Sequence, residues 1–425
     1  MILPVVGYAG MTHLGINSAV AAAERGARVV CYDHDAKLVA SLNSRVLHVV
    51  EPDLPETLAK NSERMTFTSQ PATLHDCDLV YIAVDVPTDD SGRSDLTPIT
   101  EMISAVEHAL NDDCVLVILS QVPPGFTRAI PRDDAQCIYQ VETLVFGQAV
   151  ERALNPERLI VGCSSPNTPL PPAYKSFLEA FDCPILPMRY ESAELCKISI
   201  NACLVASVST ANTLAEICEK VGADWSEITP ALRLDRRIGR FSYLNPGLGI
   251  AGGNLERDLA TIVRLASEHG TDSGVVRAWV KNSQHRRDWV LNRLHESGIL
   301  SMPDACIAVL GMAYKENTAS TKNSPSLALL GNLPSSLNVR AYDPVVTAIP
   351  SYHPGIQHYD SALEAVRDAG AVVIMTPWPE FRDLVPRDIA DAMSGSLVID
   401  PYALWDKEPC HAAGLTRMTL GVSYS

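Results

Sequence analysis

Residues 5–33 read V-V-G-Y-A-G-M-T-H-L-G-I-N-S-A-V-A-A-A-E-R-G-A-R-V-V-C-Y-D and predict the fold. An apolar run over residues 2–9 predicts a strand, a glycine-rich turn follows, and the alanine-rich stretch 16–25 predicts a helix. A second apolar run over residues 28–32 ends at Asp33. Strand, glycine turn, helix and strand with a terminal acidic residue are typical of the dinucleotide-binding βαβ unit. We therefore expect an α/β fold with a parallel sheet in this region.

The glycine-rich turn and the acidic residue predict NAD as the cofactor. The turn keeps the first and third glycines of the G-x-G-x-x-G pattern, while a threonine at the second position lets the backbone approach a pyrophosphate less freely. Asp33 would hydrogen-bond the adenosine ribose and repel a 2′-phosphate, which favours NAD over NADP; a surface carboxylate is the other interpretation. Ligands of open α/β sheets bind where strands end, so the loops after residues 79–84 and 114–119 are expected to face the cofactor. The residues expected to bind NAD are Gly10, Thr12, His13, Leu14, Gly15, Asp33, Val84, Pro87 and Ser120.

The composition limits the classes of function. At 425 residues the chain is too long for one core and predicts two or three domains. A formal net charge of −16 argues against nucleic acid and against an anionic membrane surface, and no stretch reaches the roughly 18 apolar residues that span a bilayer. The 11 cysteines form no C-x-x-C pair and no group at metal-ligand spacing, so we expect no metal site. Reduced cysteines, and a start that runs directly into a strand without a basic leader, predict a cytoplasmic protein.

Two further regions follow the first α/β unit. A stretch with few breakers over residues 191–220 predicts a long helix, which suits a connector between two lobes. From about residue 305 the pattern is α/β again. Strands are predicted over 307–311, 338–342 and 371–375 and a helix over 324–332. The expected fold is therefore α/β, with two Rossmann-like domains joined by a long central helix.

Residues 244–258, L-N-P-G-L-G-I-A-G-G-N-L-E-R-D, resemble the catalytic loop of the UDP-glucose/GDP-mannose dehydrogenase family, P-G-x-G-F-G-G-S-C-x-P-K-D. Other stretches resemble the family in the same order along the chain. They are E-P at 51–52, S-Q-V-P-P-G at 120–125, A-E-L-C-K-x-x-x-N at 193–201, D-R-R-I-G at 235–239, G-M-A-Y-K at 311–315 and A-Y-D-P at 341–344. Because so many ordered matches are hard to obtain by chance, the chain is identified as a member of this nucleotide-sugar dehydrogenase family.

The resemblance implies three domains and a set of partners. Residues 1–185 would form an NAD-binding Rossmann domain, 186–300 a central helical domain for dimerisation and substrate, and 301–425 an α/β domain that binds the nucleotide (UDP) of a nucleotide sugar. A nucleotide-sugar substrate, a homodimer built on the long helix and a role in polysaccharide biosynthesis are implied. The nucleotide, the sugar and the oxidised carbon stay open.

The resemblance also implies the residues of the site. Lys197 and Asn201 lie four apart on the predicted helix and project from one face, Lys197 as acid/base and Asn201 as a donor to a sugar oxygen. Glu142 would position or deprotonate a water or a substrate hydroxyl, with an exposed loop carboxylate as the other interpretation. Arg237 would reach the substrate of a neighbouring subunit, unless D-R-R-I-G is a surface salt-bridge cluster. The catalytic residues implied are Lys197, Asn201, Asn254, Asp258, Glu142 and Gln121, and the substrate-binding residues are Asn245, Gly249, Gly253, Arg237 and Lys315.

Three catalytic positions depart from the family pattern. Asn254 stands at the position of the nucleophilic Cys, Gln121 at that of a Thr and Phe146 at that of a second Glu. An amide cannot form the covalent intermediate, so we expect no thioester step. A single hydride transfer to NAD remains, with release of a carbonyl product. The alternatives are a redox-neutral epimerase or dehydratase that oxidises transiently, oxidation through the hydrated aldehyde, and a non-catalytic binder of nucleotide sugars.

Overall fold

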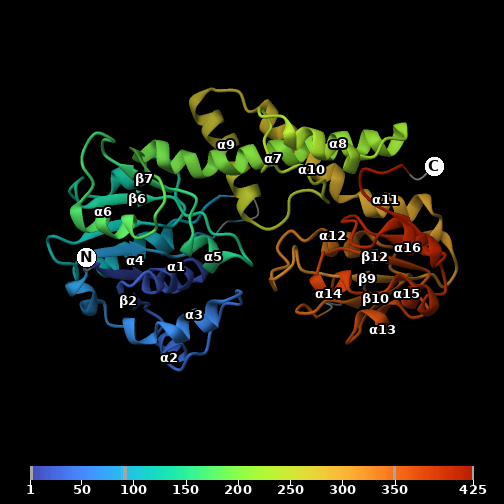
Figure 1. The fold of residues 1–425 in the computed structure, drawn as a ribbon, viewed down its shortest axis with the longest axis horizontal. Coiled ribbons are helices and arrows are strands. Elements are labelled where there is room, and N and C mark those ends of the chain that lie inside the picture. Colours follow the sequence, from blue (N-terminus) through green and yellow to red (C-terminus); the bar gives the residue numbers. More distant parts are fainter. Residues whose placement is uncertain (1–2, 88, 90–92, 348–350, 424–425) are drawn as a thin grey trace. The chain divides into compact units, whose positions relative to one another are not determined.

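The computed structural model describes residues 3–87, 89, 93–347 and 351–423. The chain divides into two compact units, Met1–Ile200 and Asn201–Ser425. In Figure 1 the sheet of the first unit is drawn in blue to green and that of the second in orange to red. Each unit is built around one sheet, which confirms the expected α/β class.

The first unit contains an eight-stranded sheet in the order β3-β2-β1-β4-β5-β6-β7-β8. All neighbours are parallel except β6 and β7. The order of the first six strands, 3-2-1-4-5-6, is that of the doubly wound dinucleotide-binding fold. The strands are β1 (Val5–Ala9), β2 (Arg28–Tyr32), β3 (Met65–Thr68), β4 (Leu79–Ile82), β5 (Val115–Ile118), β6 (Cys137–Gln140), β7 (Leu159–Cys163) and β8 (Ile185–Arg189).

Helices cover this sheet and bury its apolar strands. Every residue of β4 and β5 is buried, as near-continuous apolar runs in a parallel strand require. Helix α1 begins at His13, earlier than the predicted start at Ile16, because the glycine turn passes directly into the helix with Thr12 as its N-cap. The helices are α1 (His13–Glu24), α2 (Ala36–Asn43), α3 (Leu54–Lys60), α4 (Thr97–Glu107), α5 (Ala149–Leu154) and α6 (Pro172–Glu179), with 3-10 turns at Ser62–Arg64, Pro71–Asp76 and Thr127–Ala129.

The second unit contains a six-stranded parallel sheet in the order β11-β10-β9-β12-β13-β14. Numbered along the chain, these strands repeat the 3-2-1-4-5-6 order of the first sheet, so the second domain is also Rossmann-like. The strands are β9 (Cys306–Leu310), β10 (Asn338–Tyr342), β11 (Ile356–His358), β12 (Ala371–Ile374), β13 (Leu397–Ile399) and β14 (Thr416–Met418). The helices are α8 (Trp225–Leu234), α9 (Asn254–His269), α10 (Gly274–Arg287), α11 (Trp289–Glu296), α12 (Pro325–Asn332), α13 (Ala362–Val366), α14 (Pro379–Arg382), α15 (Pro386–Ala392) and α16 (Lys407–Ala412), with a 3-10 turn at Ile299–Ser301.

Helix α7 (Tyr190–Val221) has 32 residues and confirms the predicted long helix. Its most apolar window has a mean hydropathy of 1.3 and is 39% buried, so by length and composition alone it could cross a membrane. Core helices of globular proteins share these properties. Its buried polar residues contact protein groups: Asn201 donates to Asp258, and Asn212 accepts from the amide of Gly247. The expectation of no membrane partner stays a prediction.

Candidate active site

The glycine turn after β1 has the geometry that a bound pyrophosphate needs. Gly10 has a φ of +99°, and a Cβ there would lie 2.5 Å from Cγ1 of Val84. A Cβ on Gly15 would lie 1.8 Å from the carbonyl oxygen of Gly10, so helix and turn can approach only because both residues are glycine. Leu14 is buried in the first turn of α1. Thr12, the N-cap of α1, makes no side-chain cap hydrogen bond to the helix, and such a helix start suits an anion.

The hydroxyls near this turn are used by the protein itself. Thr12 donates from Oγ1 to the carbonyl oxygen of Ala83 at 3.0 Å. Ser120 is buried and donates from Oγ to the carbonyl oxygen of Val84 at 2.6 Å. These two residues therefore fix the end of β4, and we expect them to contact a cofactor through backbone atoms. Pro87 is exposed in the following loop and its carbonyl accepts from the amide of Asp95 at 2.8 Å.

Asp33 in the first sheet and Asp343 in the second follow corresponding strands. They differ in how many hydrogen bonds each can still accept from a ligand. Asp33 is 6% exposed and accepts from the amides of Met11 at 2.7 Å and Asp35 at 2.9 Å. Asp343, at the end of β10, accepts from the amides of residues 312, 313, 345 and 346 and from the indole of Trp378. A carboxylate has about four lone-pair sites. Asp33 thus keeps capacity for ribose hydroxyls, whereas Asp343 is saturated by the fold.

The loop that contains Gln121 is held by a buried carboxylate. Gln121 is half-buried, and Glu194, fully buried at the start of α7, accepts from the amides of Gly125 at 2.6 Å and Thr127 at 2.9 Å. Burial raises the pKa of the Glu194 carboxyl, and the amide hydrogen bonds counteract part of that rise. Glu194 therefore acts as an anchor of the loop after β5. In the sequence, Glu194 was noted only as part of the A-E-L-C-K match to the family.

Lys197 and Glu142 form an ion pair within the first unit. Nζ of Lys197 lies 3.2 Å from Oε2 of Glu142, and the two side chains are 12% and 18% exposed. Neither residue is therefore a solvated surface charge. The amide of Leu144 also donates to Glu142, so the loop backbone orients the carboxylate. A lysine held by a carboxylate in a largely buried position suits proton transfer.

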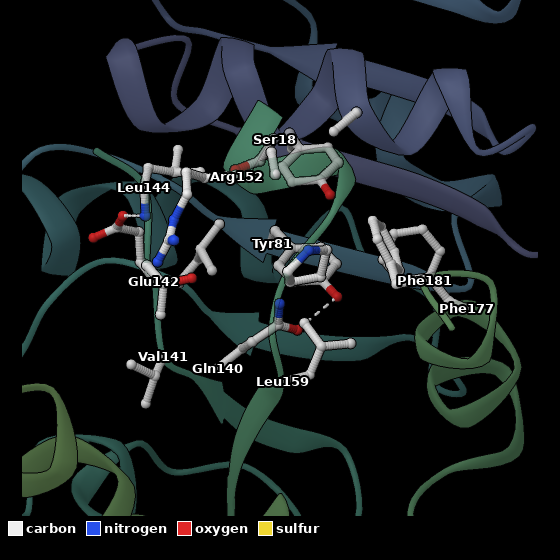
Figure 2. Close-up of a pocket in the computed structure, with 16 residues that line it drawn as sticks. Ser18, Tyr81, Gln140, Val141, Glu142, Leu144, Arg152, Leu159, Phe177 and Phe181 are labelled. Atoms are coloured by element: carbon white, nitrogen blue, oxygen red, sulfur yellow. Dashed lines mark hydrogen bonds between the residues drawn. The ribbon is translucent and has the colours of Figure 1, made fainter. Parts of the chain in front are cut away.

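The end of strand β6, just before Glu142, is held in place by two tyrosine hydroxyls. Gln140, at the end of β6, accepts through Oε1 from the hydroxyls of Tyr81 at 3.0 Å and Tyr174 at 2.7 Å. Figure 2 shows Tyr81, Gln140 and Glu142 among the residues that line a cavity of about 60 Å³. Phe177 and Phe181 lie together at one side of this cavity.

Asn201, Asp258 and Arg257 form a buried network in the second unit. Nδ2 of Asn201 donates to Oδ2 of Asp258 at 2.5 Å, and Nε of Arg257 donates to Oδ1 at 3.2 Å. The side chains of Arg257 and Asp258 are 9% and 1% exposed. Because an amide nitrogen carries two hydrogens, Asn201 keeps one donor in addition to the hydrogen bond with Asp258. The resemblance did not single out Arg257, although a charged pair directly inside α9 could have drawn attention to it.

The glycine-rich loop before α9 is shaped by close backbone contacts. Gly249 has a φ of +82°, and a Cβ there would lie 2.4 Å from the carbonyl oxygen of Ser283. Ile250 donates its amide to Oγ of Ser283 at 2.7 Å. A Cβ on Gly253 would lie 3.1 Å from the side chain of Lys322. Asn254 follows as the first residue of α9, and its side chain is exposed.

Glu256 joins this loop to residues 322–323. Its carboxylate lies 3.3 Å from Nη2 of Arg287 and accepts from the amide of Asn323, which also donates to the carbonyl oxygen of Gly252 at 2.8 Å. Burial raises the pKa of Glu256, and the positive charge of Arg287 opposes the rise. The family pattern has a proline at this position, so comparison of residue 256 with that pattern could have found it.

The remaining residues that were predicted to bind substrate lie on the surface of the second unit. Arg237 is 88% exposed and pairs with Asp235 at 2.6 Å, and Nζ of Lys315 lies 5.8 Å from the ring centre of Tyr314. Asn245 accepts from Arg233 at 3.3 Å. It lines a cavity of about 270 Å³ with Arg233, Arg240, Phe241, Ser242, Tyr243 and Leu244. The sequence missed the two arginines of this cavity, for which the run R-L-D-R-R-I-G-R at 233–240 was the available signal.

Sequence profiles of three domains of one family match most of the chain. The NAD binding domain of the UDP-glucose/GDP-mannose dehydrogenase family matches residues 5–177, the central domain 191–284 and the UDP binding domain 308–407. The chain belongs to this family. The expected NAD-binding, Rossmann-like domain and membership of the NAD-dependent nucleotide-sugar dehydrogenases are thereby confirmed. Gly10 and Asp33, with its free acceptor capacity, fit that cofactor.

Relatives of this family resemble the chain along its full length. The UDP-glucose 6-dehydrogenase TuaD of Bacillus subtilis is 29% identical, over 97% of this chain and 92% of the relative. The UDP-glucose 6-dehydrogenase of Rickettsia conorii is 27% identical, over 97% and 98%. Among solved structures, a UDP-glucose dehydrogenase from Pyrobaculum islandicum has a TM-score of 0.84 at 24% identity, over 100% of this chain and 98% of that one. UDP-D-ManNAc dehydrogenase from Pyrococcus horikoshii has a TM-score of 0.83 at 24% identity, over 99% and 100%. The solved structures show the shared fold.

The boundaries at residues 185 and 300, and the roles of the individual site residues, stay predictions. Within the described residues, no group of three or more His, Cys, Asp or Glu side chains is placed to hold a metal ion.

Proposed function

We propose that this family member oxidises an alcohol carbon of a nucleotide sugar by transferring one hydride to NAD, without a thioester step. The observation that supports this most is the pair of Lys197 and Glu142, largely buried at 3.2 Å. A protein that only binds nucleotide sugars has little need of such an acid/base group. Asn254, at the start of α9, can donate hydrogen bonds but cannot attack a carbonyl.

In the proposed reaction the neutral amine form of Lys197 takes the proton of the substrate hydroxyl while hydride leaves the carbon that carries this hydroxyl. Glu142 keeps the lysine in position and balances its charge when it is protonated. The amides of Asn201 and Asn254 are assigned as donors to the oxygen on which charge develops. Asp258 orients Asn201 through its 2.5 Å hydrogen bond. Bound NAD supplies the hydride acceptor, and the carbonyl compound is released.

The substrate is proposed to be a UDP sugar similar to UDP-glucose. The relatives from Bacillus subtilis and Rickettsia conorii are UDP-glucose 6-dehydrogenases by name, and residues 308–407 match a UDP binding domain. The cavity beside Asn245 combines Arg233 and Arg240 with exposed Phe241 and Tyr243. Guanidinium groups suit phosphate and aromatic rings suit a base, so this cavity supports a nucleotide ligand.

A homodimer in the cytoplasm is proposed as the working form. Helix α7 exposes large apolar side chains toward its C-terminal end, Leu214 at 39%, Ile217 at 50% and Val221 at 67%. An apolar helix face of this kind suits contact with a second copy.

The proposal is tested with purified protein, NAD and a panel of nucleotide sugars. NADH absorbance, together with a loss of two hydrogens in the product mass, would support it. A product with the mass of an acid would show oxidation through the hydrate instead. Turnover without net NADH would show a redox-neutral epimerase or dehydratase. Binding without turnover, unchanged by Lys197→Ala, would show a non-catalytic binder.

A further inference from the structure

Three side chains from separate segments meet beside the glycine turn of the first unit. His13 is the first residue of α1, Glu51 lies between α2 and α3, and Phe146 lies in the loop between β6 and α5. The ring of Phe146 stacks on that of His13, with centroids 4.0 Å apart and planes at 29°. Phe146 is also the residue that stands in place of a glutamate in the family pattern. Through this ring contact, the loop between β6 and α5 touches the first residue of the helix that follows the glycine turn.

Glu51 connects the same two segments through hydrogen bonds. Its Oε1 lies 2.6 Å from Nε2 of His13 and 2.8 Å from the amide of Gly147, and its Oε2 lies 3.2 Å from the amide of Ala149. The side chain of Glu51 is fully buried. Burial would raise the pKa of this carboxyl, but the hydrogen bonds from His13, Gly147 and Ala149 outweigh burial and lower it. Glu51 is therefore an ionised acceptor, and Nε2 of His13 carries the hydrogen.

The loop over residues 141–148 is thus fixed at both ends. At one end Glu142 pairs with Lys197 at 3.2 Å. At the other end Phe146 stacks on His13, and Gly147 donates to Glu51. His13 in turn is the first residue of the helix that follows the glycine turn, where the pyrophosphate of NAD is expected to bind. A displacement of this helix start would be transmitted to the loop through a ring contact and a shared carboxylate.

We propose that His13 is a positioning residue that couples NAD binding at the glycine turn to the placement of the loop carrying Glu142. The inference rests on the proposed function, because it assigns Glu142 to the reaction. Coupling of this kind is reciprocal. A change at Phe146, outside the glycine turn, must weaken NAD binding, and a change at His13 must alter a step that depends on Glu142.

The test is a double-mutant cycle on the full chain. His13→Gln keeps a donor for Glu51 but removes the ring, and Phe146→Leu removes the stacking partner. A ring pair of this kind corresponds to about a 2- to 13-fold change in an equilibrium constant. By calorimetry we expect each single variant to weaken NAD binding within that range and the double variant to bind no more weakly than the singles. Phe146→Tyr keeps the stack and should bind NAD as the wild type does.

Matched controls and a kinetic measurement separate coupling from a general structural role. His75→Gln and Phe181→Leu change the same residue types elsewhere in the first unit, on an exposed 3-10 turn and against Phe177, and should leave the Kd for NAD unchanged. At saturating NAD, His13→Gln should still lower kcat severalfold, because the ring contact that helps to hold the Glu142 loop is lost.

The outcomes distinguish this inference from the proposed function. Single-variant effects that multiply in the double variant, or an unchanged Kd for NAD in both singles, would overturn the coupling. If His13→Gln does not fold, the comparison of Phe146→Leu with Phe146→Tyr decides the same question. A wild-type protein that shows the coupling in NAD binding but oxidises no nucleotide sugar would overturn the proposed function and leave the coupling in place.

Discussion

Substitution of Asp258 tests the buried network that positions Asn201. Asp258→Asn keeps the shape of the side chain but removes the charge that faces Arg257 at 3.2 Å. The two side chains are 1% and 9% exposed, so water cannot replace the lost partner. Removing one member of a buried ion pair costs about 3–5 kcal/mol. We expect a loss of that size in the free energy of unfolding of the second unit.

The chain offers a specific probe for this measurement. Its 5 tryptophans, Trp225, Trp279, Trp289, Trp378 and Trp405, all belong to the second unit. Urea unfolding followed by tryptophan fluorescence therefore reports this unit without a signal from the first, which avoids treating a two-unit chain as one transition.

A matched pair provides the control. Asp235 also pairs with a nearby arginine, Arg237, at 2.6 Å. In this pair, however, the side chains are 30% and 88% exposed. Exposed ion pairs contribute little to stability because solvent screens them. Asp235→Asn should therefore have the same urea midpoint of unfolding as the wild type. Equal midpoints for Asp258→Asn and Asp235→Asn would refute the assignment of a buried charge pair to the site.

Three further predictions concern Lys197 and Glu51 of the first unit and Asn254, which departs from the family pattern. Lys197→Met should lower kcat about 10²- to 10⁴-fold, as expected for loss of an acid/base group, while calorimetry shows that NAD still binds. Asn254→Cys places a thiol at the N-terminus of α9, which lowers thiol pKa values, so mass spectrometry should find this position alkylated by iodoacetamide faster than exposed Cys203 at pH 7. Glu51→Gln should lower stability by about 1–3 kcal/mol at pH 7. Because the pKa of Glu51 is lowered in the folded state, its contribution is present above the ordinary value of 4.5 and is lost as the pH falls below it. Thermal unfolding by circular dichroism should then show that the Tm values of the wild type and of Glu51→Gln converge in acid. A Tm difference that stays constant with pH would contradict the lowered pKa of Glu51.

Local sequence pattern was sufficient for the elements that position the site. The run 5–33 contains its own strand, turn and helix signals, and the structure has all three with boundaries that differ by a few residues. The predicted strands over 338–342 and 371–375 correspond to β10 and β12. These elements are specified by apolar runs and glycines that lie next to one another in the chain, and a parallel sheet buried on both faces leaves few alternatives.

The partners of the catalytic residues could not be predicted in the same way. Glu142 and Lys197 are 55 residues apart, and Glu51 and Gly147 are 96 apart. No periodicity connects such positions, because their meeting depends on how the strands are ordered in the sheet. Family resemblance passed over Glu256 and Arg257. The role of Glu256 follows from its neighbours Arg287 and Asn323, and that of Arg257 follows from its burial beside Asp258.

The loop before α9 can change its chemistry without changing its shape. Its course is set by Gly249 against Ser283, by Ile250 bonded to the same serine, and by Gly252 against the ring of Tyr314. In the described part of the chain, the side chain of Asn254 takes part in no hydrogen bond or ion pair, and it is exposed. Replacement of a nucleophile at this position therefore removes a reaction step at little structural cost, whereas any side chain at Gly249 would meet the backbone of α10 at 2.4 Å. We therefore propose that asparagine at this position keeps the shape of the loop and leaves hydride transfer without a thioester step.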